Sequence, residues 1–164
     1  MPRKIQGFTL LELLVAITLL IIVASVACIN YSPLINRIRV NTMSHQLTSI
    51  IQFAQLNALT YQQQMILTPY QQQNWSSGWK LFSTDQTTGQ QTLLREFSNT
   101  HNNLHIQLAA FPQADKLQWQ ADGLLTQNNG HFTISLDSIQ QQLIINKAGR
   151  IRTEGIGIRA NKNV

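Results

Sequence analysis

An apolar run near the N-terminus constrains this chain more than any other feature. Between residues 8 and 29 the only charged side chain is Glu12. A run of this length can cross the roughly 30 Å hydrocarbon core of a bilayer as a helix. Arg3 and Lys4 precede it, so the positive-inside rule predicts a cytoplasmic N-terminus and an extracytoplasmic remainder. We therefore expect a transmembrane helix over residues 8–30.

A secretory signal peptide and a lipoprotein signal are two alternatives to a transmembrane helix at the N-terminus. A secretory signal peptide has an apolar core of only about 7 to 15 residues and carries no acid there. A lipoprotein signal ending at Cys28, the single cysteine, would follow the sequence Ser-Val-Ala, which is a poor lipidation match. Both alternatives leave Glu12 unexplained, although an acid in mid-membrane costs on the order of 3 kcal/mol and usually has a partner.

The stretch GFTLLELL, preceded by a short basic leader, carries a specific pattern: a glycine, a phenylalanine, and an acid four residues after that phenylalanine. It resembles the class III leader of type IV pilins and type II secretion pseudopilins. The resemblance implies that a prepilin peptidase removes residues 1–7 by cutting after Gly7 and methylates the new N-terminal Phe8. It also implies that Glu12 meets the free N-terminal amine of a neighbouring subunit during filament assembly.

The segment after the apolar run has the period of an amphipathic helix, which we expect over residues 31–63. Apolar side chains recur three or four residues apart, at Val40, Met43, Leu47, Ile50, Ile51, Ala54, Ala58 and Tyr61. Arg37, Asn41, His45, Thr48, Ser49, Gln52 and Gln55 form the opposite, polar face. Pro33 is expected to kink the helix where its two halves meet.

Beyond residue 63 the apolar period changes from three or four to two. Seven short runs with β-branched or aromatic content read as strands: MILTPY, GWKLFS, TLLREF, LHIQLAA, KLQWQA, HFTISL and QLIINK. Turn signals lie at residues 76–78, 88–89, 122–123 and 128–130. The pattern predicts a β-rich head over residues 64–146, built as two packed sheets.

Within the head, the segments GWKLF, FPQADKLQWQADGLLTQNNGHFTISL and IINKAGRIR resemble the GspH/FimT branch of minor pilins and pseudopilins. The resemblance implies an α+β, pilin-like fold. Its long N-terminal helix has a transmembrane half and an amphipathic half, and it packs on a head of two small antiparallel sheets.

The positive charge of the chain is concentrated at its C-terminal end. The whole chain carries +5, and residues 147–164 hold five cations against the single anion Glu154. These cations are Lys147, Arg150, Arg152, Arg159 and Lys162. Three glycines in the same segment predict a flexible basic loop. In an extended chain Arg150 and Arg152 would share one face, and two guanidiniums side by side suit phosphate.

The run Gly149-Arg150-Ile151-Arg152 also matches a GRxR motif of the FimT branch, whose members bind DNA during natural transformation. The resemblance implies a DNA-binding role for Gly149, Arg150 and Arg152. Charge and proximity alone add Lys147, Arg159 and Lys162 as an extension of the phosphate track. A solvated basic end is the alternative interpretation, and related secretion pseudopilins carry similar endings.

Catalysis is not expected, because the sequence has no nucleophile motif, phosphate loop or paired carboxylates, and we expect no cofactor. His101 and His105 have the spacing of zinc ligands on a helix, but their segment reads as a loop entering a strand, so no metal site is expected. Trp75, Trp79 and Trp119 could stack on bases or sugars, or could pack in the core.

These observations predict a minor type IV pilin that captures DNA without sequence specificity for uptake. Its expected partners are the DNA phosphate backbone, other pilins, the prepilin peptidase and the bacterial inner membrane. The head would lie in the periplasm and reach the cell surface in an assembled pilus. A minor pseudopilin at the tip of a type II secretion filament is the alternative, and a membrane-anchored enzyme is a third class.

Overall fold

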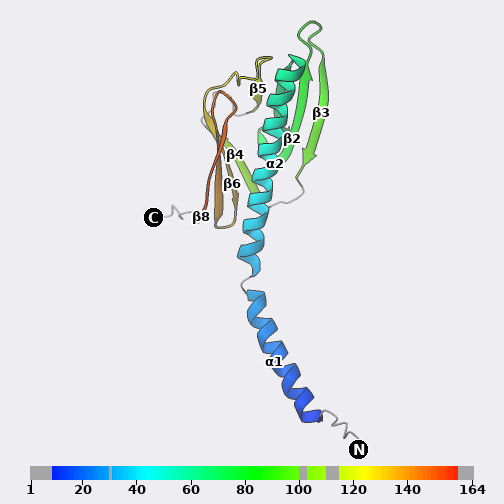
Figure 1. The fold of residues 1–164 in the computed structure, drawn as a ribbon, viewed down its shortest axis with the longest axis vertical. Helices are drawn as coiled ribbons and strands as arrows, with labels where there is room; N and C mark the ends of the chain where they lie inside the picture. Colours follow the sequence, from blue (N-terminus) through cyan, green and yellow to red (C-terminus); the bar gives the residue numbers. More distant parts are fainter. Residues whose placement is uncertain (1–8, 30, 100–102, 110–114, 159–164) are drawn as a thin grey trace, which may run out of the picture. The chain divides into compact units, whose positions relative to one another are not determined.

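The computed structural model describes residues 9–29, 31–99, 103–109 and 115–158, without the side chains of residues 26–29, 156 and 158. The chain divides into two compact units, Met1–Ile35 and Asn36–Val164 (Figure 1).

The first unit contains helix α1, Leu10–Ile29. Every side chain described in this helix is exposed, and its few hydroxyl groups bond to their own backbone: Thr18 donates to the carbonyl of Val15 and Ser25 to that of Ile22. In the part of the chain that the structure describes, no helix combines the length and hydropathy that a membrane crossing requires. The transmembrane segment over residues 8–30 stays a prediction.

Helix α2, Tyr31–Tyr61, follows the amphipathic pattern and supplies one wall of the head. Its buried residues are Val40, Met43, Ser44, Leu47, Ile50, Ile51, Ala54 and Ala58, so the predicted stripe is confirmed except at its end. Tyr61 is 66% exposed, because the helix ends there and the chain turns away. Pro33 lies in the first turn of α2, where a missing N–H breaks no bond within that helix.

The first sheet has the strand order β3-β2-β1-β5, with all neighbours antiparallel. Its strands are β1 (Gln64–Gln71), β2 (Asn74–Thr84), β3 (Gln91–Ser98) and β5 (Leu117–Trp119).

The turn predicted at residues 76–78 is wrong, because β2 runs through it and the chain turns at residues 72–73 instead. Gly78 has a positive φ of 111° within β2, and a Cβ there would lie 2.0 Å from the carbonyl oxygen of Phe97. This glycine permits close strand packing, not a turn.

The turn between β2 and β3 lies where the sequence predicts it. Gly89 has a φ of 69°, and the Asp85 carboxylate accepts hydrogen bonds from the backbone N–H groups of Thr87 and Thr88 at 2.7 and 2.9 Å. The bonds from Thr88 and Thr87 stabilise the ionised carboxylate and so lower the pKa of Asp85.

The second sheet has the order β4-β6-β7-β8 and is also antiparallel. Its strands are β4 (Leu104–Ala109), β6 (Gly130–Leu136), β7 (Ile139–Ile145) and β8 (Ile151–Ile158). Each of the seven predicted runs overlaps a strand, but β8 falls in the segment that the sequence predicts to be a flexible loop. The basic segment is therefore ordered as an edge strand over residues 151–158.

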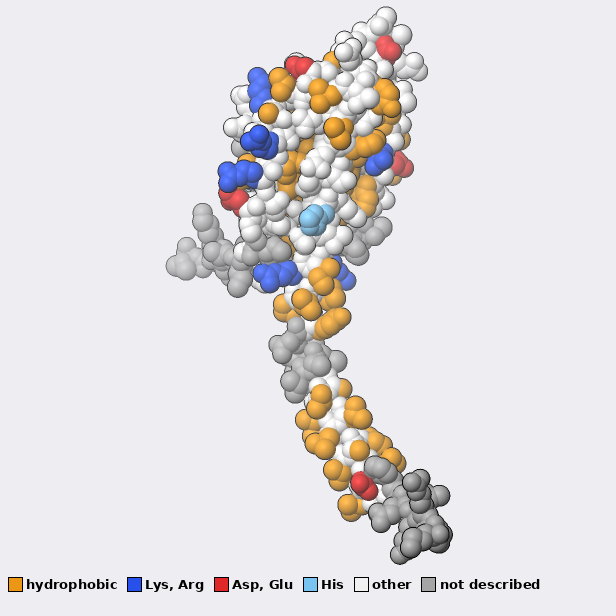
Figure 2. Space-filling view, viewed as in Figure 1, with side chains coloured by type: hydrophobic (Ala, Val, Ile, Leu, Met, Phe, Trp, Pro, Cys, Tyr) orange, Lys and Arg blue, Asp and Glu red, His pale blue; other side chains and the backbone are white. Residues whose placement is uncertain are grey.

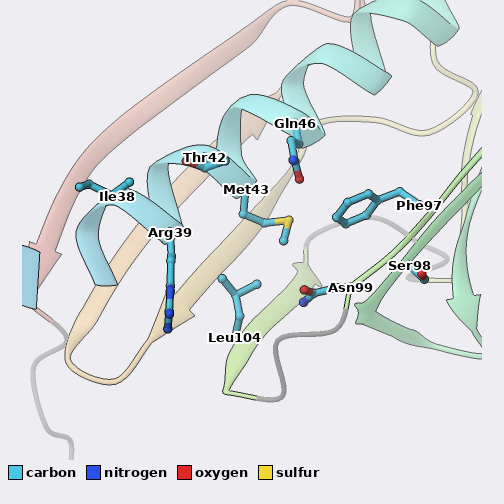
Figure 3. Close-up of a pocket in the computed structure, with 9 residues that line it drawn as sticks. All are labelled: Ile38, Arg39, Thr42, Met43, Gln46, Phe97, Ser98, Asn99 and Leu104. Atoms are coloured by element: carbon cyan, nitrogen blue, oxygen red, sulfur yellow. The ribbon is translucent and has the colours of Figure 1, made fainter. Parts of the chain in front are cut away.

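The hydrophobic core joins α2 to both sheets. Figure 3 shows Met43 from α2, Phe97 from β3 and Leu104 from β4 lying around one hollow between these elements. Trp75 of β2 meets Phe132 of β6 edge to face, with ring centroids 5.0 Å apart. The α+β head with two antiparallel sheets that the sequence predicts is thus observed.

The three tryptophans belong to this core. Trp75, Trp79 and Trp119 are 2%, 3% and 0% exposed. Rings buried to this degree cannot stack on a ligand, so the packing interpretation holds and the stacking platform is excluded.

Candidate nucleic-acid interface

The basic residues begin in a tight turn that connects β7 to β8. The N–H of Gly149 donates to the carbonyl of Asn146 at 2.9 Å, and the N–H of Arg150 donates to Oδ1 of Asn146 at 2.8 Å. The N–H of Asn146 donates to the carbonyl of Arg150 at 3.2 Å. Gly149 has a φ of 74°, which is a left-handed conformation that favours glycine. The turn is therefore closed by its own hydrogen bonds.

Gln55 of α2 attaches this turn to the rest of the head. Its amide Nε2 donates to the carbonyl of Ala148 at 2.8 Å and to that of Gly123 at 3.2 Å. Gly149 is buried against the same amide, and a Cβ at this glycine would lie 2.4 Å from Nε2 of Gln55. The period of the helix predicts Gln55 on its polar face, where nothing in the sequence distinguishes this amide from its neighbours.

A second set of bonds attaches the turn to the loop before β6. The backbone N–H of Lys147 donates to Oδ1 of Asn129 at 3.2 Å, and its carbonyl accepts from the N–H of Leu125 at 2.9 Å. The backbone of Lys147 is thus fixed, while its side chain is exposed.

Arg150 and Arg152 are both exposed, and Ile151 between them is packed against the core. This alternation is the one that the sequence predicts for an extended chain. In β8, Arg152 lies opposite Ile144 and Glu154 opposite Gln142. Figure 2 shows Lys and Arg side chains gathered along the flank of the head that carries β8, with an acidic side chain beside them.

The remaining predicted site residues are distributed along the chain. Arg159 and Lys162 lie outside the described residues, as do Gly7 and Phe8.

Glu12 lies in the first turn of α1, where its N–H donates to Oγ1 of Thr9 at 3.3 Å. Thr9-x-x-Glu12 is the sequence signature of a capping box, and an acid in the first turn also complements the helix dipole. The position of Glu12 therefore has a local cause, which the sequence analysis missed.

Elsewhere in the described structure, the groove and the histidine below lack the groups typical of a catalytic or metal site. The groove of about 280 Å³ in Figure 3 is lined by apolar, hydroxyl and amide side chains with one cation, Arg39, and its lining includes neither a carboxylate nor a histidine. Among the described residues, no three metal-ligating side chains come together. His105 is exposed in β4, and its predicted companion His101 lies outside the described residues.

Two family models match this chain. The family described as Type II transport protein GspH matches residues 44–149, and the prokaryotic N-terminal methylation motif matches residues 2–27. A search of curated proteins finds no match.

Two solved structures have a similar fold. The type IV minor pilin FimU of Pseudomonas aeruginosa strain PAO1 is 20% identical, with a TM-score of 0.59 over 73% of this chain and 90% of that one. The minor pseudopilin EpsH from the Type 2 Secretion System of Vibrio cholerae is 11% identical, with a TM-score of 0.53 over 70% of this chain and 94% of that one.

These findings agree with each other along the chain. The GspH match covers more than half of the sequence, and the methylation motif covers the N-terminus. The similarity to FimU and EpsH confirms the predicted pilin-like fold, and at these identities it shows the fold alone. The chain therefore belongs to the GspH family, within the superfamily of type IV pilins and type II secretion pseudopilins.

Proposed function

We propose that this GspH-family chain is a minor type IV pilin that binds extracellular DNA through its GRxR turn for uptake in natural transformation. The observation that supports this most is the fixed presentation of Arg150 and Arg152. Both guanidiniums are exposed, while Ile151 between them packs against the core and Gln55 bonds to the adjacent backbone of Ala148. A rigid backbone lowers the entropy lost when the arginines bind a phosphate.

The mode of binding follows from the kind of side chain at the turn. Guanidinium groups bind phosphate oxygens through two parallel hydrogen bonds, and these contacts carry no sequence information. Lys147, Arg159 and Lys162 would extend the phosphate contacts. We expect affinity that is roughly micromolar or weaker for one head and that falls steeply with salt concentration.

The first prediction concerns the two arginines. The full chain in a neutral detergent is titrated with labelled duplex DNA at two salt concentrations, together with an Arg150→Ala/Arg152→Ala variant. Loss of two phosphate contacts should weaken binding at least about tenfold and reduce the slope of log affinity against log salt by about 1.8. Circular dichroism and thermal unfolding check that the variant is folded.

The matched control removes the same charge elsewhere in the head. Arg37 and Arg39 of α2 are also exposed and two residues apart, so Arg37→Ala/Arg39→Ala tests whether net charge alone explains binding. Equal losses in the two double variants, or no binding by the intact chain at low salt, would overturn the proposed DNA site.

The N-terminus has a proposed function of its own. Residues 1–7 are the leader, and cleavage after Gly7 leaves Phe8 as a methylated N-terminus. The apolar segment anchors the subunit in the inner membrane with a periplasmic head. Glu12 then meets the N-terminal amine of a neighbouring pilin as the filament grows, because an ion pair is stronger where water is excluded.

The second prediction tests this processing. Mass spectrometry of the chain expressed with a prepilin peptidase should show a mature form that begins with N-methylated Phe8. A Gly7→Leu variant should retain the leader under the same conditions, while Gln6→Ala, at the neighbouring position, should be processed normally. Detection of an intact leader on the unaltered chain would contradict the proposed cleavage.

A GspH-like minor pseudopilin of a type II secretion system is the second candidate function. The family description and the fold shared with EpsH favour it. In that role the head would contact other pseudopilins at a filament tip. If the intact chain fails to bind DNA, co-purification with the pseudopilins encoded by the same cell is the measurement that tests it.

A further inference from the structure

We infer that the DNA site extends from β8 across the outer face of the second sheet, where His131 acts as an additional phosphate-binding residue when protonated. This inference rests on the proposed DNA-binding function and assigns a second contact and a regulation by pH to the same site.

The register of the second sheet places His131 and Arg152 in one cross-strand row. Ala109, His131, Ile144 and Arg152 are successive cross-strand partners from β4 to β8. Direct partners in an antiparallel sheet point to the same face. In the neighbouring positions Phe132, Leu143 and Ile145 are fully buried, so this row lies on the opposite, outer face. Arg152 and His131 therefore flank Ile144 on one surface.

The spacing of these two side chains suits a DNA strand. Two strand intervals separate β6 from β8, which places the backbones of His131 and Arg152 about 10 Å apart. Phosphates of one DNA strand rise by about 3.4 Å each along the helix axis and also wind around it, so phosphates one or two steps apart are separated by roughly 7 to 12 Å, which brackets this spacing. One strand could thus contact Arg152 and His131 together.

The surroundings of His131 leave it available for such a contact. Its imidazole is partly exposed, and Ala109 beside it on β4 is small and exposed. The next row of the same face consists of Gln107, Thr133, Gln142 and Glu154. These amides and the hydroxyl can donate hydrogen bonds to phosphate oxygens.

The charged groups on this face determine the direction of the pH effect. Facing His131, Ala109 and Gln107 on β4 and Ile144 and Gln142 on β7 carry no charge. From β8, Arg152 lies in its row and Glu154 lies diagonally beyond Gln142. Phosphate at the site favours the imidazolium, so DNA binding and protonation of His131 should promote each other.

The test measures DNA affinity at two pH values with the full chain in a neutral detergent. Between about pH 7.5 and about pH 5.5 the affinity for mixed-sequence duplex should rise at least about threefold. The salt slope should become steeper by about 0.9, as expected for one more phosphate contact. In His131→Gln both changes should be lost.

Two further variants make the test specific. His105→Gln changes a histidine on the same face, in β4 at the opposite edge of the sheet, and should keep the full pH response. His131→Lys carries a permanent cation, and it should bind at pH 7.5 as tightly as the unaltered chain binds at pH 5.5. This gain of affinity cannot arise from misfolding.

The outcomes separate this inference from the proposed function. DNA binding that depends on Arg150 and Arg152 but is the same at both pH values, or that keeps its pH response in His131→Gln, would overturn the role of His131 and leave the GRxR site intact. No binding by the unaltered chain at either pH would overturn the proposed function itself.

Discussion

At the scale of single residues, the turn before β8 shows how one glycine fixes a functional surface. The sequence predicts that Gly149 gives the tail freedom to flex. In the structure its φ of 74° and its contact with Gln55 hold the chain in one conformation. The same property of glycine, the absence of a Cβ, serves rigidity here because the neighbouring side chain fills the space.

Gly149→Ala is therefore expected to destabilise the head by about 1–3 kcal/mol, because alanine is strained in the left-handed region and its Cβ would displace the Gln55 amide. Loss of the bonds from Gln55 should also weaken DNA binding. Urea unfolding of residues 36–164, the unit that holds the whole hydrophobic core, measures the first effect.

Gly155→Ala is the matched control for this prediction. It makes the same substitution six residues later, and a Cβ there meets nothing within 4 Å. Its effect on the free energy of unfolding should be within about 0.5 kcal/mol. If Gly149→Ala is as stable as Gly155→Ala, the turn is not constrained in the way the geometry indicates.

At the scale of elements, the period of the apolar residues predicts seven strands and misses the eighth. Strands such as Phe132–Leu136 alternate large buried residues with polar ones, which sequence patterns report directly. Strand β8 contains two glycines, an arginine and a glutamate between its isoleucines, a composition typical of a loop. It forms because the backbone groups of β7 require partners, and an edge strand tolerates charge and glycine.

The error at residues 76–78 has a related cause. Ser-Ser-Gly is a common turn sequence, and nothing local distinguishes a glycine that turns from one that admits a neighbouring strand. The approach of Phe97 to Gly78 depends on the pairing of β2 with β3, which are separated by a turn in the sequence.

At the scale of the whole head, side chains link the two sheets, which share no backbone ladder among the described residues. Ser76 of β2 is one of the links: its Oγ accepts a hydrogen bond from the N–H of Ile106 in β4 at 2.8 Å and lies 3.4 Å from the carbonyl of the same residue. The contact of Trp75 with Phe132 is the apolar counterpart. These links attach the second sheet, which contains β8 and Arg152, to the first.

Ser76→Ala should accordingly lower the free energy of unfolding of residues 36–164 by about 1–3 kcal/mol, since it leaves the N–H of Ile106 without its partner. Urea unfolding followed by tryptophan fluorescence measures the loss. Ser138→Ala, in the exposed turn between β6 and β7, is the control and should change stability little. Equal stability of the two variants would show that the hydroxyl of Ser76 does not link the sheets.

The sequence by itself determined the N-terminal methylation motif, the buried stripe of α2, seven strands and the exposed pair Arg150 and Arg152, because each depends on local composition or on a short period. The tertiary structure alone decided that residues 151–158 form a strand, that Gln55 holds the turn of Gly149, and that His131 shares a face with Arg152. The contact of Gln55 and the shared face of His131 and Arg152 join segments that are far apart in the sequence, while β8 forms by pairing with its neighbour β7. Neither kind of contact leaves a periodic signal in the residues that take part.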